Sequence, residues 1–107
     1  MNKTFSRILE LLEINQVKIS SHGYDELAED GILVKDVLAN IKDAKILEDY
    51  PDYPKGPCVL VLQKDLKGEP IHVIWGLSKN TNFPAVLVTA YRPDPKYWSN
   101  DFTRRKK

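Results

Sequence analysis

The chain has 107 residues and a formal net charge of +1, with 42% hydrophobic and 29% charged residues. This composition is typical of one globular domain over residues 1–107 and excludes a disordered chain. The longest uninterrupted apolar run, residues 58–62, is far shorter than the ~20 residues of a transmembrane helix. Because the N-terminus lacks the apolar stretch of a secretory signal and Cys58 is the single cysteine, we expect a cytoplasmic protein without membrane contact.

The first part of the chain has helical periodicity. Residues 1–19 predict an amphipathic helix over about 4–15 and an extended connector at 17–19, and the apolar face of that helix comprises Phe5, Ile8, Leu9 and Leu12. Ser20 or Ser21 can cap a second helix over about 22–30, which Gly31 would end in a left-handed conformation. A third helix is predicted over 34–43.

After residue 44 the periodicity changes to two. Strands are predicted over 45–50, 58–65, 70–78 and 85–92, and short connections between them indicate an antiparallel meander. A last helical turn is predicted within 94–102, before a frayed basic tail at 103–107. The expected fold is α+β, with the helices on one face of a sheet of about four antiparallel strands and the other face partly free.

Alternation along the last two strands predicts which side chains share a face. We expect the strand at 70–78 to turn its odd-numbered residues to the helices, and His72 with Gly76 to the free face. In the strand at 85–92, Val86, Val88 and Ala90 are expected in the core. Tyr91 would then share the free face with His72.

Charge is distributed unevenly along the chain. Residues 20–54 hold three lysines and nine acids, a net charge of −6, whereas residues 55–107 hold ten basic and four acidic residues, a net charge of +6. This asymmetry predicts either a basic face for an anion and an acidic face for another partner, or charges that only solvate the surface.

The two histidines are the natural acid–base candidates, since imidazole titrates near neutral pH. We hypothesise that His22, His72, Tyr91 and Arg92 form a metal-independent site for phosphodiester cleavage. In this site one group accepts the 2′-hydroxyl proton, another protonates the leaving oxygen, and the guanidinium stabilises the charge at phosphorus. The alternatives are a capping or packing role for His22 and a structural role for His72.

The remaining candidates concern ligands. Cys58 and the two histidines lack metal-ligand spacing, so we expect neither a metal nor a cofactor. The residues expected to contact RNA, by stacking or through the phosphates, are Trp98, Lys67, Arg104 and Arg105.

From about residue 20 to 105, the chain resembles the bacterial domain-of-unknown-function family 4258. The motifs that carry the resemblance are Ser20-x-His22, Leu27, Gly31-Ile32, Asp36-Val37, Ile46-x-Glu48-x-Tyr50, Pro70-Ile71-His72-Val73, Val88-Thr89-Ala90-Tyr91-Arg92-Pro93-Asp94 and Trp98. The resemblance implies a small toxin of a bacterial toxin–antitoxin pair, with a RelE/barnase-like ribonuclease fold and a zinc-finger antitoxin as partner. It also implies that His22, His72 and Tyr91 match recurring family residues, with Arg92 and Trp98 matching less strictly.

The sequence departs from the family pattern in the helix that follows His22. Where many members carry arginines, this chain has Glu26 and Asp30, and Gly23 replaces an alanine. Anions in place of cations would weaken contact with an RNA backbone. Two functions therefore stay open: an endoribonuclease toxin, and a non-catalytic interaction module that binds a basic partner.

Overall fold

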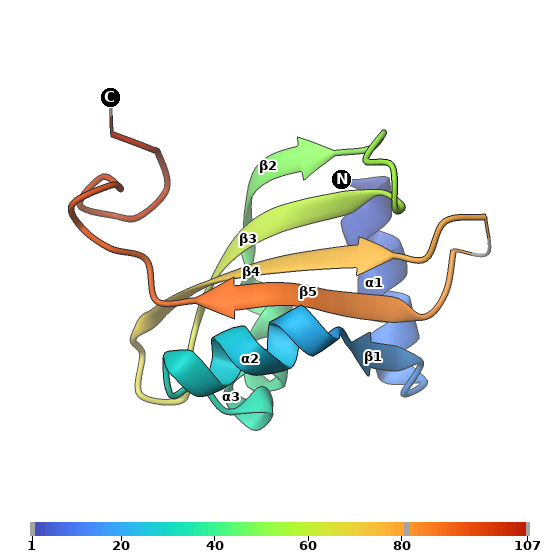
Figure 1. Ribbon diagram of the computed structural model, residues 1–107, viewed down its shortest axis with the longest axis horizontal. Coiled ribbons are helices and arrows are strands. Elements are labelled where there is room, and N and C mark those ends of the chain that lie inside the picture. The colour runs from blue at the N-terminus through green and yellow to red at the C-terminus, as the bar shows by residue number, and fades with distance from the viewer. Residues whose placement is uncertain (1, 81, 107) are drawn as a thin grey trace.

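In the computed structural model, which describes residues 2–80 and 82–106, three α-helices are followed by most of a five-stranded sheet (Figure 1). The helices are α1 (Lys3–Glu13), α2 (Ser21–Glu29) and α3 (Val34–Ala39), and a 3-10 turn follows at Ile41–Asp43. The strands are β1 (Val17–Ile19), β2 (Lys45–Tyr50), β3 (Cys58–Lys64), β4 (Pro70–Leu77) and β5 (Ala85–Tyr91). The predicted α+β class is confirmed, although the third helix breaks at Asn40.

The sheet is mixed, in the order β1-β5-β4-β3-β2. Strands β2 to β5 form the predicted antiparallel meander. The expected connector at 17–19 is β1, which pairs in parallel with residues 85–87 of β5. The prediction of about four antiparallel strands was therefore one strand short, because three residues are too few to show a period of two.

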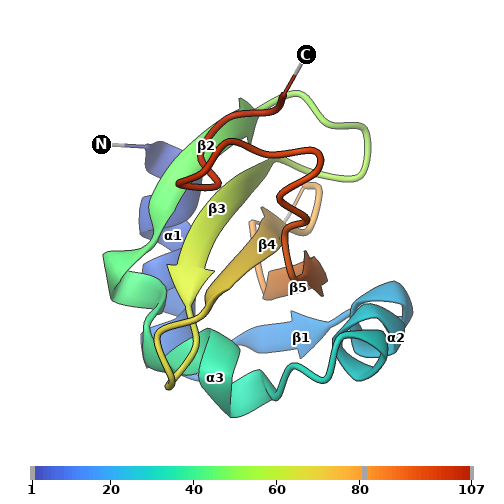
Figure 2. The ribbon, with the colours of Figure 1, turned by 90° about the vertical axis from the view of Figure 1, so that its left-hand side faces the viewer.

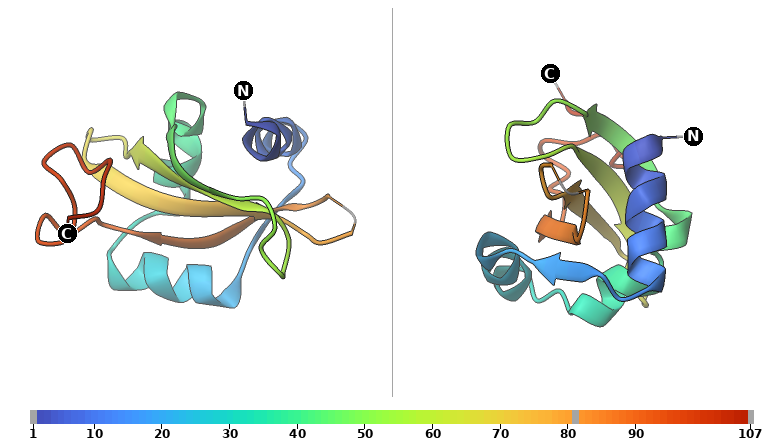
Figure 3. Two further views of the ribbon diagram at one scale, coloured as in Figure 1. Left: turned by 90° about the horizontal axis from the view of Figure 1, so that it is seen from above. Right: turned by 90° about the vertical axis from the view of Figure 1, so that its right-hand side faces the viewer.

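The helices do not all lie on one face of the sheet. Figure 3 shows α1 and α3 on one side and α2 on the other, alongside β5. β1 covers only the first half of β5, and α2 covers the rest: the Ser20 hydroxyl, which caps α2, donates to the Val88 carbonyl at 2.8 Å. A Cβ on Gly23 would lie 2.8 Å from the Leu87 carbonyl oxygen, so this approach requires glycine. The predicted one-sided arrangement is thus wrong for α2.

The core lies between α1, α3 and the sheet. Trp75 of β4 is fully buried there among aliphatic side chains. Its indole N–H donates to the Gln63 side-chain oxygen at 3.0 Å, and the Gln63 amide donates to the Val37 carbonyl at 2.7 Å. This relay satisfies the polar groups that the core encloses. The predicted core face of β4 is confirmed.

The predicted faces of β5 are only half right. A bulge between Ile74 and Trp75 of β4 shifts the register, so that Thr89 and Leu87 pair with consecutive β4 residues. As a result Leu87 and Ala90 are in the core, whereas Val86 and Val88 lie on the free face. One extra residue in a strand exchanges the faces of the residues that follow.

The chain beyond β5 folds back over the free face (Figure 2). Its predicted helical turn is limited to the amides of Tyr97 and Trp98, which donate to the Asp94 carbonyl. The expected frayed tail is instead docked as far as residue 106, since Arg105 pairs with Trp98 in an isolated β-bridge; Lys107 lies outside the described residues. Residues 94–106 are called the C-terminal strap below.

Candidate functional site

The first feature of the free face is a histidine–tyrosine pair. His72 of β4 lies opposite Tyr91 of β5, as predicted, and its Nδ1 is 3.2 Å from the tyrosine hydroxyl. The other ring nitrogen, Nε2, is 2.8 Å from the Phe102 carbonyl oxygen of the strap. Because a carbonyl only accepts, Nε2–H is the donor, and in neutral imidazole Nδ1 then accepts from the tyrosine hydroxyl.

Both members of this pair are neutral at pH 7. Burial lowers the pKa of the His72 imidazole, although the Phe102 carbonyl opposes this shift. Burial also raises the pKa of the Tyr91 phenol. The free face therefore encloses a neutral hydrogen-bonded pair rather than a buried charge.

The strap seals the pair from solvent. The Trp98 ring packs edge-on against the His72 ring, with centroids 4.3 Å apart, and the exposed fraction of His72 is 0%. Arg105 stacks on Trp98 at 4.8 Å and binds both carboxylate oxygens of Glu48 in β2, at 3.0 and 3.1 Å. These hydrogen bonds hold the pKa of the Glu48 carboxyl below its usual range, against the effect of burial. One aromatic ring and one ion pair thus close this end of the face.

The second feature is an open groove of about 570 Å³ at the other end of the face, between the start of α2 and the β2–β3 loop. We call it the His22 groove. Its polar rim comprises Ser20, His22, Tyr50, Tyr53, Lys55 and Ser78. Its floor is largely apolar and comprises Cys58, Ile74, Gly76, Leu77, Val86 and Val88. Gly76 keeps the floor low, since an added Cβ would lie 3.3 Å from the Cys58 Cβ.

His22 is the one histidine that lines this groove. Its side chain is 66% exposed and its Nε2 lies 3.6 Å from a Glu26 carboxylate oxygen. The ring follows the Ser20 cap, so the first turn of α2 fixes its position. An accessible imidazole oriented by a carboxylate can act as a general base.

Arg92 lies outside both features. Its guanidinium pairs with Asp65 at 2.9 Å and donates to the Pro70 carbonyl at 3.4 Å, at the β3–β4 turn. Its backbone N–H donates to Asp30 at 2.7 Å. The four predicted catalytic residues are therefore not gathered: His72 and Tyr91 meet, His22 is in the groove, and Arg92 is held elsewhere. The Asp30 carboxylate therefore accepts a hydrogen bond from the backbone at the end of β5.

The four predicted RNA-contacting residues lie on two segments, the strap and the β3–β4 turn. Trp98 is 5% exposed beneath Arg105, so it can stack on a base only if the strap moves. Arg104 is exposed on the strap, whereas Lys67 is exposed on the β3–β4 turn. Tyr53 and Lys55, which line the groove, were not among the predicted site residues. The sequence feature that could have indicated them is the proline-rich loop with aromatic and basic residues in which they lie.

No group of three or more His, Cys, Asp or Glu side chains within residues 2–80 and 82–106 is arranged to hold a metal ion. In the same part of the chain, no helix combines the length and apolar character needed to cross a membrane.

The fold and site define an α+β protein with an open mixed sheet, a strap-covered histidine–tyrosine pair and an adjacent groove. Residues 19–92 match the family model described as Domain of unknown function (DUF4258). Since the match spans most of the chain, the protein belongs to this family, as the sequence motifs indicated. No curated protein matches the chain, and no solved structure does.

Proposed function

We propose that the protein is the toxin of a bacterial toxin–antitoxin pair, with a RelE/barnase-like relationship, and cleaves RNA without a metal ion. The observation that carries the proposal is the His22 groove, in which an exposed imidazole, the Lys55 ammonium and two tyrosines surround an apolar floor. A volume of about 570 Å³ lies within the range of small-ligand sites. Such a groove suits one nucleotide of a single strand, with its base against a tyrosine ring.

The reaction begins at His22. Its imidazole accepts the proton of a ribose 2′-hydroxyl, and Glu26 stabilises the imidazolium that forms. The 2′-oxygen attacks phosphorus, the bond to the 5′-oxygen breaks, and the products are a 2′,3′-cyclic phosphate and a 5′-hydroxyl. Lys55 stabilises the negative charge at phosphorus, in place of Arg92, which is ion-paired with Asp65.

The leaving 5′-oxygen takes its proton from water in the open groove, and the His22 imidazolium returns its proton to solvent. The His72–Tyr91 pair is not the donor, because it lies at the other end of the face and His72 Nδ1 accepts from the Tyr91 hydroxyl. Its proposed role is structural: Nε2–H of His72 holds the strap through the Phe102 carbonyl.

Cleavage of a single-stranded RNA by the purified chain, in the presence of a chelator, tests the proposal. We expect fragments that end in a 2′,3′-cyclic phosphate. His22→Ala should slow cleavage by about 10²–10⁴-fold, the contribution of one acid–base group. Lys55→Ala should also slow it, whereas Lys64→Ala, which removes an exposed lysine outside the groove, should not. Equal rates for the wild type and His22→Ala, or no cleavage across pH and salt, would contradict the proposal.

A second candidate is a non-catalytic module that binds a basic partner protein. It is favoured by the sealing of His72 and by the acids at Glu26 and Asp30, which oppose contact with an RNA backbone. Expression in a bacterial host separates the two functions. Growth arrest that His22→Ala relieves supports the endoribonuclease, whereas the absence of arrest supports the module.

A further inference from the structure

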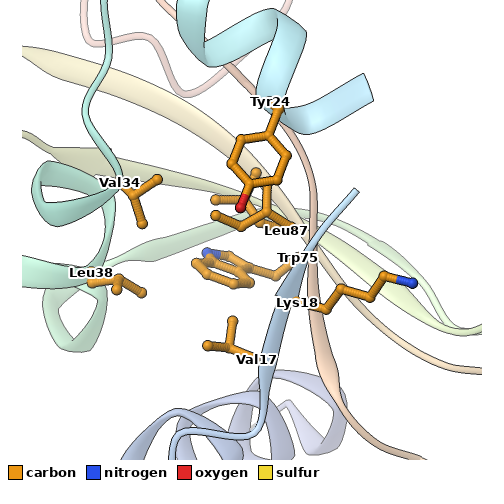
Figure 4. Close-up of a pocket in the computed structure, with 8 residues that line it drawn as sticks. Val17, Lys18, Tyr24, Val34, Leu38, Trp75 and Leu87 are labelled. Atoms are coloured by element: carbon orange, nitrogen blue, oxygen red, sulfur yellow. The ribbon is translucent and has the colours of Figure 1, made fainter. Parts of the chain in front are cut away.

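On the side of the sheet away from the His22 groove, an apolar cup lies beside β1. It has a volume of about 320 Å³, and we call it the β1 cup. Figure 4 shows Tyr24, Val34 and Leu38 around it, with the Trp75 indole between them. Tyr24 and Leu38 are 58% and 39% exposed, although both are large side chains at the mouth of an apolar depression. The cup thus offers apolar surface from α2, α3 and β1 to a binding partner.

The strand that borders the cup has a free edge. β1 is the terminal strand of the sheet and pairs with β5 alone. The Gln16 carbonyl accepts from the Ala85 amide of β5, and the Ser20 amide donates to the Leu87 carbonyl of β5. In a parallel pair every second residue bonds to the neighbouring strand, so the backbone N–H and C=O of Lys18 also point to β5. The N–H and C=O groups of Val17 and Ile19 therefore point away from the sheet. Across residues 2–80 and 82–106, no strand pairs with this edge.

The charge around the cup indicates what kind of strand can add there. Residues 21–39, which contain the two helices that contribute to the cup, hold five acids and one lysine, a net charge of −4, whereas the one charged residue among the described residues that line the cup is Lys18 of β1. Asp25 and Glu29 are exposed on α2, the helix that carries Tyr24. A segment rich in lysine or arginine complements this surface, whereas a second copy of the chain would oppose two negative surfaces.

We propose that the β1 edge and cup dock an extended, basic segment of a partner protein. The segment adds a strand beside β1 through the backbone of Val17 and Ile19, and places one apolar side chain in the cup. Backbone hydrogen bonds supply affinity in this mode of recognition, and the pocket beside the edge supplies specificity. The docking surface is separate from the His22 groove, so this inference does not depend on RNA cleavage.

A synthetic peptide in which lysine alternates with leucine is the probe, and fluorescence anisotropy measures its affinity for the full chain. We expect this peptide to bind and its analogue with glutamate in place of lysine not to bind. Leu38→Lys should weaken binding by about tenfold or more, since it places a positive charge at the mouth of the cup, where the basic peptide docks. Leu66→Lys is the matched control, because this leucine is 61% exposed on the β3–β4 turn, away from the cup, and should leave affinity unchanged.

Amide hydrogen exchange tests the strand addition itself. In the free chain the amides of Val17 and Ile19 should exchange fast and that of Lys18 slowly, and the peptide should protect the first two. Absence of peptide binding, equal binding by Leu38→Lys and Leu66→Lys, or unprotected Val17 and Ile19 amides in the complex would overturn the proposal. A dimer of the chain that Leu38→Lys dissociates would also overturn it, by identifying a second copy as the occupant.

Discussion

The strap can be opened by one substitution, and the rate at which His72 then reacts measures the opening. Arg105→Ala removes the ion pair with Glu48 and the cation–π contact with Trp98. An exposed ion pair contributes about 0.2–1 kcal/mol, and an exposed cation–π contact about 0.5–1 kcal/mol. The sum, about 0.7–2 kcal/mol, corresponds to an increase of about 3- to 30-fold in the population of the open strap.

Diethylpyrocarbonate, which modifies accessible imidazole, is the assay for this opening. His72 is 0% exposed, so it reacts only in the open state, and its modification rate should rise by the same 3- to 30-fold in Arg105→Ala. His22 is already exposed and should react equally in both proteins, which makes it the internal control. Trp98→Ala, which also removes the ring packed on His72, should increase the rate further. An unchanged His72 rate in both variants would show that these contacts do not hold the strap.

Three further predictions concern stability, each measured by urea unfolding. Ser20→Ala should lower the free energy of unfolding by about 1–2 kcal/mol, because it removes both the cap of α2 and the bond to β5, whereas Ser21→Ala, at an exposed neighbour, should have little effect. Gln63→Leu should lower it by about 2–5 kcal/mol, because it leaves the Trp75 N–H and a buried carbonyl without partners. The pKa of His72 is lower in the folded chain than in the unfolded chain, so as the pH decreases the unfolded chain takes up the proton at a higher pH. The free energy of unfolding should therefore fall as pH decreases below 6.5, with a slope of at most about 1.4 kcal/mol per pH unit from this group. His72→Gln should remove that part of the slope, and an unchanged pH dependence would contradict a buried neutral imidazole.

The sequence predicted the elements with strong periodicity. Strands β2 to β5 begin at the predicted residues and end within one residue of the prediction, because apolar side chains alternate along them. The meeting of His72 and Tyr91 followed from the same alternation. The prediction that Val86 and Val88 face the core was wrong. Every residue of β5 up to the bulge is apolar, so the sequence pattern does not reveal the extra residue.

Features that depend on distant contacts could not be predicted. β1 is defined by its pairing with β5, 68 residues further along the chain at Val17 and Ala85, rather than by its own three residues. The strap has no periodicity, and it is ordered by contacts of Trp98 and Arg105 with strands β4 and β2. The groove joins the start of α2 to a proline-rich loop, so Lys55 could not be assigned before the fold placed it beside His22.

Binding of RNA in the His22 groove can be measured by an amide chemical-shift titration with a single-stranded RNA whose 2′-hydroxyls are methylated. Methylation blocks cleavage, so the complex persists while its contacts are mapped. We expect the largest shifts on amides that line or border the groove, including Gly23, Gly56 and Ser78, and we expect Lys55→Ala to reduce them. Shifts confined to the β1 cup, or no shifts at low salt, would contradict it.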